Sequence, residues 1–211
     1  MLPPTIPIFP LPNVVLFPNV FLPLHIFEPR YRAMVREAIE GDRIIGMALL
    51  KPGFESNYEG RPPIYQIGCA GVITHSEPLP DGRFNIVLRG LEKFRITAED
   101  RSKPYRMAQI ESIAEDVPES ERTPLHQQRT RLEAVLAAAI ERSGAEPRFP
   151  PAVADEDLVN ALAQYMELEP LERQALLERE GVLSRCRGLI ELVEMKSLSP
   201  KGASWKTRPV H

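Results

Sequence analysis

Hydrophobic positions are spaced differently in the two halves of this chain. From Ile6 to about Ala114 they form short runs rich in Val, Ile and Phe, interrupted by Pro and Gly, as is typical of strands joined by turns. From about Glu119 to Leu198, Leu and Ala recur at helical spacing among Glu and Arg. The acidic segment 115–124 separates the two patterns. We therefore expect a β-rich unit over residues 1–118, a helical bundle over 119–198 and a flexible tail over 199–211.

The first pattern predicts short strands near residues 6–9, 14–17, 20–26, 43–50, 65–76, 83–88, 92–96 and 105–113. Proline cannot donate a hydrogen bond to a strand ladder, so the first three segments, which are spaced by prolines, are expected at edges or bulges. Asp81-Gly82 predicts a tight hairpin, and Gly90 predicts a kink or a second turn. Many short strands with regular turns favour a small barrel or a sandwich.

Helical periodicity appears once in the first half and repeatedly in the second. Residues that favour helix starts and ends bracket these stretches: Pro29 and Gly41, Thr123-Pro124 and Gly144, Asp155, and Pro170 and Gly181. A last helix is marked by Leu183, Cys186, Ile190 and Val193. The first helix should cover one opening of the strand assembly, and the others should pack as a compact bundle.

Composition narrows the classes of partner. The chain has 211 residues, of which 43% are hydrophobic, so it can bury a real core. Its net charge of −3 argues against nucleic acid, because binding to phosphates is driven by basic charge. An RNA-binding face is the alternative that the sequence leaves open, built from Arg83, Arg89, Lys93, Arg95, Arg101, Lys103 and Arg106.

The sequence carries no signal for a membrane, and its cysteines do not suggest secretion. Pro interrupts the apolar N-terminus, and no apolar run reaches the roughly 18 residues of a membrane span. Cys69 and Cys186 lie far apart in apolar contexts, which predicts reduced core residues rather than a disulfide. We expect a cytoplasmic protein.

No arrangement of residues predicts catalysis. The histidines His25, His75, His126 and His211 are not paired with other ligands at a metal spacing. A phosphate-binding loop and a glycine-flanked nucleophilic serine are both absent from the sequence. We therefore expect no metal, no cofactor and no enzymatic activity.

The run 6–35, IPIFPLPNVVLFPNVFLPLHIFEPRYRAMV, resembles the opening of the Lon protease N-terminal, substrate-binding domain. The motif positions that carry the resemblance are Phe9, Pro10, Leu11, Phe17, Pro18, Pro23, Leu24, Phe27, Glu28, Pro29, Arg30 and Tyr31. Further matches lie at Gly68, Gly71, Gly82, Gly90 and Arg95. One departure is Lys93, where arginine is the expected residue.

This resemblance implies an α+β fold: a PUA-like, six-stranded pseudo-β-barrel with one inserted helix, followed by a helical bundle. It also implies a stand-alone, non-catalytic module of protein quality control, because the ATPase and protease of a full Lon protease do not follow in this chain. The implied partners are unfolded segments or partner proteins. A homodimer stays open.

Two regions are candidates for the binding surface. The loop 51–65 carries Phe54, Tyr58, Arg61 and Pro62, which could grip exposed apolar segments. Phe17 and Phe21 lie in edge-like strands, where an extended peptide could add as a further strand. The structural alternative is a loop folded back on the barrel and phenylalanines in the core. For the run 28–31 we expect a mainly structural role, with Glu28 opposing the helix dipole and Arg30 pairing with a carboxylate elsewhere in the barrel.

Overall fold

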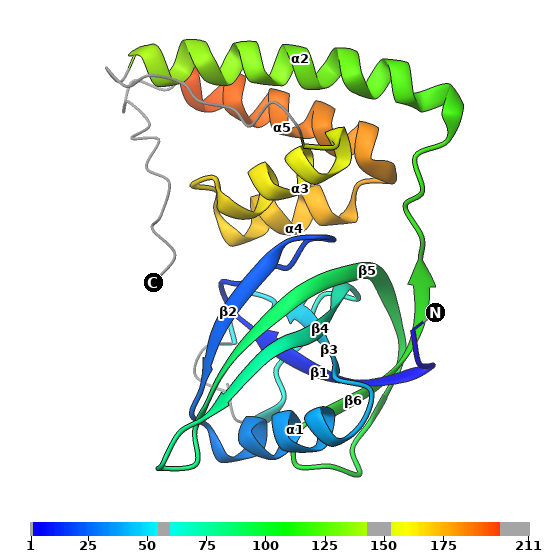
Figure 1. Cartoon of the computed structure of the whole chain (residues 1–211), viewed down its shortest axis with the longest axis vertical. Coiled ribbons are helices and arrows are strands. Elements are labelled where there is room, and N and C mark those ends of the chain that lie inside the picture. Colours follow the sequence, from blue (N-terminus) through cyan, green and yellow to red (C-terminus); the bar gives the residue numbers. More distant parts are fainter. Residues whose placement is uncertain (1, 55–59, 143–152, 199–211) are drawn as a thin grey trace. The chain divides into compact units, whose positions relative to one another are not determined.

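The computed structural model describes residues 2–54, 60–142 and 153–198 (Figure 1). Its strands and helices are β1 (Thr5–Leu11), β2 (Phe21–Ile26), α1 (Pro29–Glu40), β3 (Ile44–Leu49), β4 (Ile67–Pro78), β5 (Phe84–Asp100), β6 (Arg106–Ile113), α2 (Glu119–Arg142), α3 (Asp155–Tyr165), α4 (Pro170–Glu178) and α5 (Gly181–Leu198). They group into two compact units, residues 1–114 and 115–211. The predicted α+β fold is confirmed, whereas the predicted tail 199–211 lies outside the described residues.

The strands of the first unit close into a ring. The sheet order is β2-β5-β4-β3-β1-β6, and β6 also pairs with β5, so every strand except β2 has a neighbour on both sides. β1 runs parallel to β3 and antiparallel to β6. β5 is long enough to pair with β2 along its first half and with β6 along its second half. β2 therefore lies outside the ring, as an edge strand on β5 (Figure 1).

Side chains at alternate positions of the ring strands point inward and form one core cluster: Ile6, Ile8, Ala48, Leu50, Ile64, Ala70, Phe94, Ile96, Ala108 and Ile110. Phe94 is the largest of them and is fully buried. A Cβ atom at Gly46 or Gly68 would lie 2.9 or 2.6 Å from the Phe94 ring. These two glycines therefore make room for that ring in a close-packed interior.

Helix α1 covers the outer face of β1. The ring centroids of Tyr31 and Phe9 lie 4.4 Å apart, and Met34 is fully buried one turn further along the helix. Glu28 occupies the N-cap position, where its negative charge opposes the positive end of the helix dipole. Arg30 Nε donates to the Glu28 carboxylate at 3.0 Å. The partner of Arg30 is therefore a carboxylate two residues away at the helix start, and not one elsewhere in the barrel as predicted.

Two predictions for the first unit are wrong: the segment 14–17 is not a strand, and β1 is not an edge strand but pairs with both β3 and β6. β5 continues through Gly90 without a second turn, but its register with β4 shifts between Gly90 and Lys93, as the kink predicted at Gly90 requires. The chain at 17–20 instead turns against β5, where Asn19 N–H donates to the Gly90 carbonyl at 3.0 Å and Gly90 N–H donates to the Val20 carbonyl at 2.9 Å. A Cβ atom at Gly90 would lie 2.0 Å from the Phe17 carbonyl oxygen. The absence of a side chain at Gly90 therefore lets the crossing chain approach β5 closely.

Helix starts in the second unit are shifted from their predicted positions. α2 begins at Glu119 rather than at Thr123, so Pro124 lies inside it. The missing N–H of Pro124 removes one hydrogen bond near the helix start, and acidic residues in the first turn interact favourably with the helix dipole. Asp155 is the first residue of α3 rather than its cap, whereas Pro170 opens α4 as predicted.

A buried ion pair lies inside the second unit. Arg185 of α5 is fully buried, and its Nη2 lies 2.7 Å from both carboxylate oxygens of Glu115. Its Nη1 donates to Asn160 Oδ1 of α3 at 2.7 Å, and its Nε donates to the Leu176 carbonyl of α4 at 3.1 Å. One side chain thus connects three helices with the first residue of the unit.

Both cysteines are buried free thiols, as predicted. Burial raises the pKa of the Cys186 thiol to about 12. Cys186 is therefore protonated at neutral pH, and the thiolate needed for nucleophilic chemistry is not formed there.

Candidate peptide-binding surface

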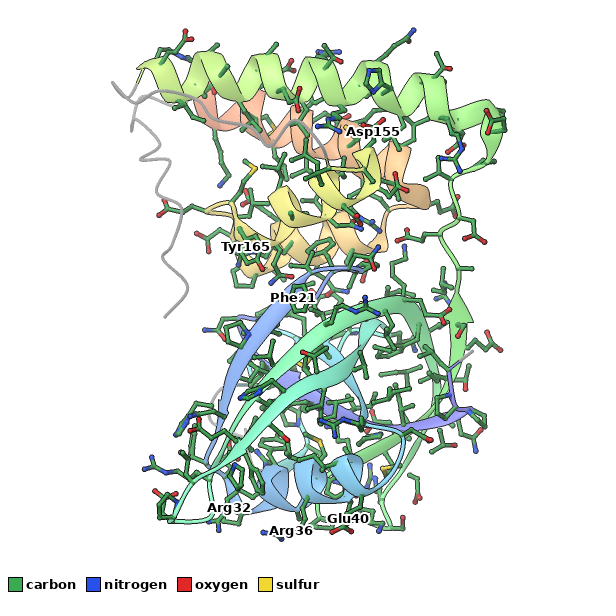
Figure 2. The ribbon with its side chains drawn as sticks, viewed as in Figure 1. Phe21, Arg32, Arg36, Glu40, Asp155 and Tyr165 are labelled. Carbon is green, nitrogen blue, oxygen red and sulfur yellow. The ribbon has the colours of Figure 1, made fainter. Side chains whose placement is uncertain are left out.

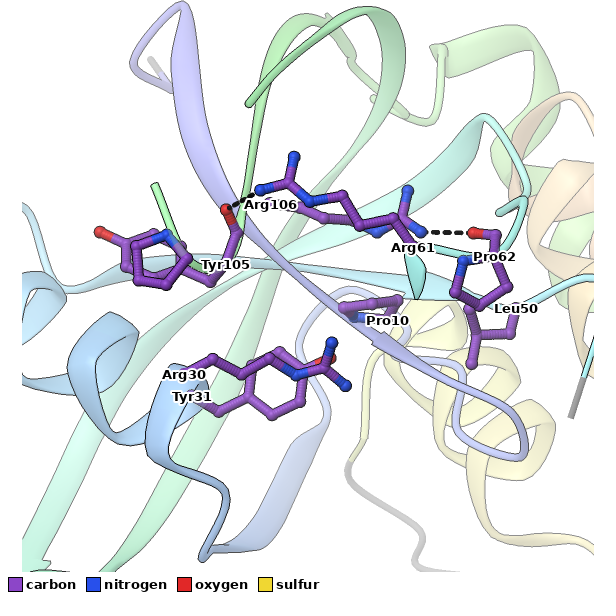
Figure 3. Close-up of a pocket in the computed structure, with 9 residues that line it drawn as sticks. Pro10, Arg30, Tyr31, Leu50, Arg61, Pro62, Tyr105 and Arg106 are labelled. Atoms are coloured by element: carbon purple, nitrogen blue, oxygen red, sulfur yellow. Dashed lines mark hydrogen bonds between the residues drawn. The ribbon is translucent and has the colours of Figure 1, made fainter. Parts of the chain in front are cut away.

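The loop residues Arg61 and Pro62 line a small pocket at the end of the ring, together with Arg30, Tyr105 and Arg106 (Figure 3). The cavity measures about 10 Å³. That is roughly the room that one water molecule needs. A peptide side chain does not fit into it, so this pocket is not the binding site.

Arg61 and Arg106 instead fasten the loop to the turn between β5 and β6. Arg61 adopts a left-handed backbone with φ of 58°, and its Nη2 donates to the carbonyls of Lys103 at 2.6 Å and Tyr105 at 3.3 Å. Arg106 donates to the Pro62 carbonyl (Figure 3). It also donates to a carboxylate oxygen of Glu99 at 2.8 Å. The sequence predicts Arg61 and Pro62 as ligand contacts, but their described contacts are to the protein itself.

Replacing Arg61 with alanine is expected to loosen the loop, because three backbone carbonyls lose a charged donor. The cost is about 1–2 kcal/mol. Hydrogen exchange should accelerate at the amides of Lys51 and Tyr65, which bond across the two ends of the loop. The matched control is Arg101→Ala, at an exposed arginine of the same turn. Unchanged exchange in the Arg61 variant would show that the clamp does not hold the loop.

Of the other residues predicted to contact a ligand, the structure leaves Phe54 and Phe21 exposed. Phe54 is 41% exposed, and Tyr58 lies outside the described residues. Phe17 is fully buried, so its side chain cannot touch a ligand, and we remove it from the candidate surface. Phe21, in contrast, is 50% exposed and projects from β2 (Figure 2).

Phe21 belongs to a row of outward side chains that we call the β2 face: Phe21, Pro23, His25 and Phe27. Every second residue of a strand faces the same side, and the first three members of this row are exposed while the alternating Ile26 is buried. Phe27, just after the strand, is 61% exposed and stacks on His25 with ring centroids 6.4 Å apart. The face thus displays two phenylalanine rings, Phe21 before Pro23 and Phe27 after it.

The backbone of β2 explains how Pro23 is tolerated. Gly90 N–H donates to the Val20 carbonyl, which makes that residue pair a hydrogen-bonded one in the ladder with β5. Hydrogen-bonded and non-bonded pairs alternate in antiparallel strands, and Pro23 lies opposite Val87, three positions along. Its nitrogen therefore points away from β5, to the outer edge, where no ladder bond is lost.

Polar neighbours hold the His25 ring in place. Its Nδ1 lies 2.8 Å from Asn85 Oδ1, and Arg83 Nη1 lies 3.3 Å from its Nε2. A guanidinium only donates, so Nε2 accepts and Nδ1 carries the proton. Arg83 is itself oriented by Asp81 through a 2.6 Å bond from its Nε. The ring against which Phe27 stacks is thereby fixed on both sides.

Most other motif residues have structural surroundings. Phe9, Pro10, Pro18 and Tyr31 are buried, Leu11 and Leu24 are half-buried, and exposed Pro29 is the first residue of α1. A Cβ atom added at Gly71 would lie 2.9 Å from the Leu16 side chain. Gly82 lies in the β4–β5 turn with a φ of 80°. Arg95 is exposed on β5, opposite Glu111 of β6. Pro23 and Phe27 differ from the predicted structural role, because both side chains are exposed on the β2 face and Phe27 is more exposed than Phe21.

Four of the seven residues proposed for an RNA-binding face are buried or paired, whereas Arg89, Arg95 and Arg101 are exposed. Lys93 and Arg106 are buried. Arg83 pairs with Asp81, and Lys103 pairs with Glu37. Paired or buried cations release few counterions, and counterion release drives binding to phosphates.

Metal sites and membrane spans are also absent from the described ranges. Among residues 2–54, 60–142 and 153–198, no group of His, Cys, Asp or Glu side chains is placed to hold a metal ion. Within the same ranges, no helix combines the length and the apolar composition that a membrane span requires.

Comparison with known proteins decides the family. Residues 5–195 match the family model of the ATP-dependent protease La (LON) substrate-binding domain. The chain belongs to the LON substrate-binding domain family. The predicted resemblance is therefore confirmed over nearly the whole chain, including both units.

Full-length relatives of this LON domain are longer than it is. The Lon protease of Flavobacterium johnsoniae is 28% identical over 213 residues, which cover 95% of this chain and 25% of that protein. Lon protease 2 of Myxococcus xanthus is 25% identical, over 92% of this chain and 24% of that protein. The chain thus spans about a quarter of the length of the curated relatives that it matches.

Solved structures share the fold of this LON domain. The Lon N-terminal domain protein from Xanthomonas campestris superposes with a TM-score of 0.60 at 22% identity, over 89% of this chain and 97% of the other. The N-terminal domain of the Mycobacterium avium complex Lon protease gives a TM-score of 0.62 at 18% identity, over 90% and 98% of the two chains.

Proposed function

We propose that this LON domain binds extended apolar segments of other protein chains on its β2 face and takes no part in bond cleavage. The observation that carries the proposal is the pair of exposed aromatic rings, Phe21 and Phe27, on one face of an edge strand. The family match supports it, because the matched region is a substrate-binding domain. The proposal also includes a role in protein quality control and a location in the cytoplasm.

Physical chemistry favours this face over the rest of the first unit. Aromatic side chains supply large apolar contact area at a low entropy cost and dominate binding energies at protein interfaces. Pro23 between the two rings adds a rigid apolar surface. Arg89 lies directly opposite Phe21 on β5, where a planar guanidinium can stack on an aromatic ring of a bound segment. The face therefore favours segments that combine aromatic and aliphatic residues.

The double variant Phe21→Ser, Phe27→Ser tests the proposal. Unfolded, fluorescently labelled casein serves as the probe, and its affinity is measured by anisotropy. We expect a loss of at least about tenfold, since truncating two interface aromatics costs more than 1.4 kcal/mol. Both side chains are exposed, so the variant should stay folded.

Leu171→Ser is the matched control, because it removes a side chain of similar exposure, 49%, from the helical unit. Its effect on casein binding should stay below about twofold. Equal losses in the two variants, or unchanged binding in the double variant, would contradict the β2 face as the binding site.

A further inference from the structure

We propose that a groove between β1 and the end of α1 is a second binding site, which holds the lysine or arginine side chain of a bound protein segment. This inference rests on the proposed function only in taking protein segments as the ligand. It concerns a different surface of the first unit, formed by other residues than those of the β2 face.

The groove has the size of a single side chain. Its volume is about 210 Å³. That is somewhat more than the roughly 150 Å³ cavity that accommodates a benzene molecule, and less than the 300 Å³ or more of pockets for drug-sized ligands. One long side chain therefore fits, and a larger cofactor does not.

The groove is apolar inside and acidic at its rim. Its apolar lining comes from Ala38 of α1 and half-buried Met107 of β6, with the fully buried Met34 packed behind this surface. The exposed carboxylates of Glu37 and Asp42 also line it. Lysine and arginine have this same division, with an apolar stem and a charged head that stays near water.

The two carboxylates differ in their present partners. Glu37 accepts a bond from the protein's own Lys103 Nζ at 2.7 Å and one from the Tyr105 hydroxyl at 2.8 Å. These two donors lower the pKa of Glu37. Asp42 has no ion-pair partner in the part of the chain that the structure describes. A second cation would therefore be attracted to Asp42 at the rim.

The backbone of β1 beside the groove pairs with its two neighbours over different lengths. β1 pairs with β3 only from Ile8 onward, whereas its pairing with β6 begins at Thr5. Ile110 N–H donates to the Pro4 carbonyl, so even-numbered residues of β1 bond toward β6 and Thr5 directs its peptide groups the other way. The peptide groups of Thr5 thus lie on the side of β1 that faces β3, whose first residue Ile44 also lines the groove.

The test uses the full chain with 13C-labelled methionine methyl groups, observed by NMR. The probe is a short capped peptide with one central lysine, and the comparison peptides carry norleucine or glutamate at that position. We expect the lysine peptide to shift the signals of Met34 and Met107, assigned through Met→Leu variants. The norleucine peptide should bind about three- to fivefold more weakly, the worth of an exposed charge pair.

Asp42→Asn should weaken the lysine peptide by a similar three- to fivefold factor. Glu40→Gln is the matched control, because it removes the same charge at the end of α1 from a residue outside the groove (Figure 2). It should change the affinity by less than about 1.5-fold. Equal shifts with the lysine and glutamate peptides, or an unchanged affinity in Asp42→Asn, would overturn the proposal.

The outcomes separate this site from the β2 face. The lysine peptide should still shift both methionine signals in the Phe21→Ser, Phe27→Ser variant. If that variant binds casein normally while the methionine signals respond, the β2 face fails and the groove stands. If the double variant loses casein and the methionine signals do not move, the groove fails and the β2 face stands.

Discussion

Replacing Arg185 with methionine is expected to lower the free energy of unfolding of the helical unit by about 3–5 kcal/mol. The guanidinium is fully buried and bonds to Glu115, Asn160 and the Leu176 carbonyl. Methionine fills much of the volume but leaves the Glu115 carboxylate without its cation in a poorly solvated place. Denaturant unfolding, followed by far-UV circular dichroism, measures the change.

Arg131→Met is the control for Arg185. Arg131 forms a 2.8 Å ion pair with Glu194, and both side chains are about half exposed. Such a surface pair contributes at most about 1 kcal/mol. Adding Glu115→Leu to Arg185→Met should restore part of the lost stability, because the unpaired carboxylate is then removed. A single Arg185 variant that unfolds within about 1 kcal/mol of the parent would contradict this role.

Gly90→Ala is expected to destabilise the first unit by about 3 kcal/mol. The added Cβ would lie 2.0 Å from the Phe17 carbonyl oxygen, which is backbone and cannot rotate away. Relief requires the turn at 17–20 to move off β5, which breaks its two hydrogen bonds to Gly90. Thermal unfolding should show a fall in Tm on the order of 10 °C.

Gly41→Ala provides the comparison for Gly90. A Cβ atom there would lie 3.5 Å from the Glu37 carbonyl oxygen, an ordinary contact. The stability should change by less than about 0.5 kcal/mol. If the two variants lose the same amount of stability, the close approach of the Phe17 carbonyl does not explain the glycine at position 90.

Local signals in the sequence predicted the elements whose cause is local. Pro29 and Gly41 bracket α1, and Pro170 opens α4. The segment 14–17 was misassigned because its apolar residues Val15, Leu16 and Phe17 are buried by packing in a turn rather than in a strand. The chain that crosses Gly90 is distant in sequence, so no local signal predicts that close approach.

The candidate surface was predictable in part. Alternating Phe21, Pro23, His25 and Phe27 show a period of two on one side of a strand, which would have marked Phe27 as outward-facing with Phe21. The hydrogen bonds from the Arg61 side chain to the protein itself could not be predicted. Their acceptors are backbone carbonyls of a turn some forty residues away in the sequence. The sequence does not show which carbonyls a loop will meet.

The outward-pointing nitrogen of Pro23 affects the tendency of copies of this protein to aggregate through β2. An edge strand that carries exposed aromatics is ordinarily a template for aggregation, because neighbouring chains can extend its ladder. Here the central amide donor is missing from that edge. A cross-β stack nucleated on β2 would lack one backbone hydrogen bond in each layer, which discourages fibril growth from this edge. The Phe21 and Phe27 rings can therefore remain exposed for the proposed binding of protein segments.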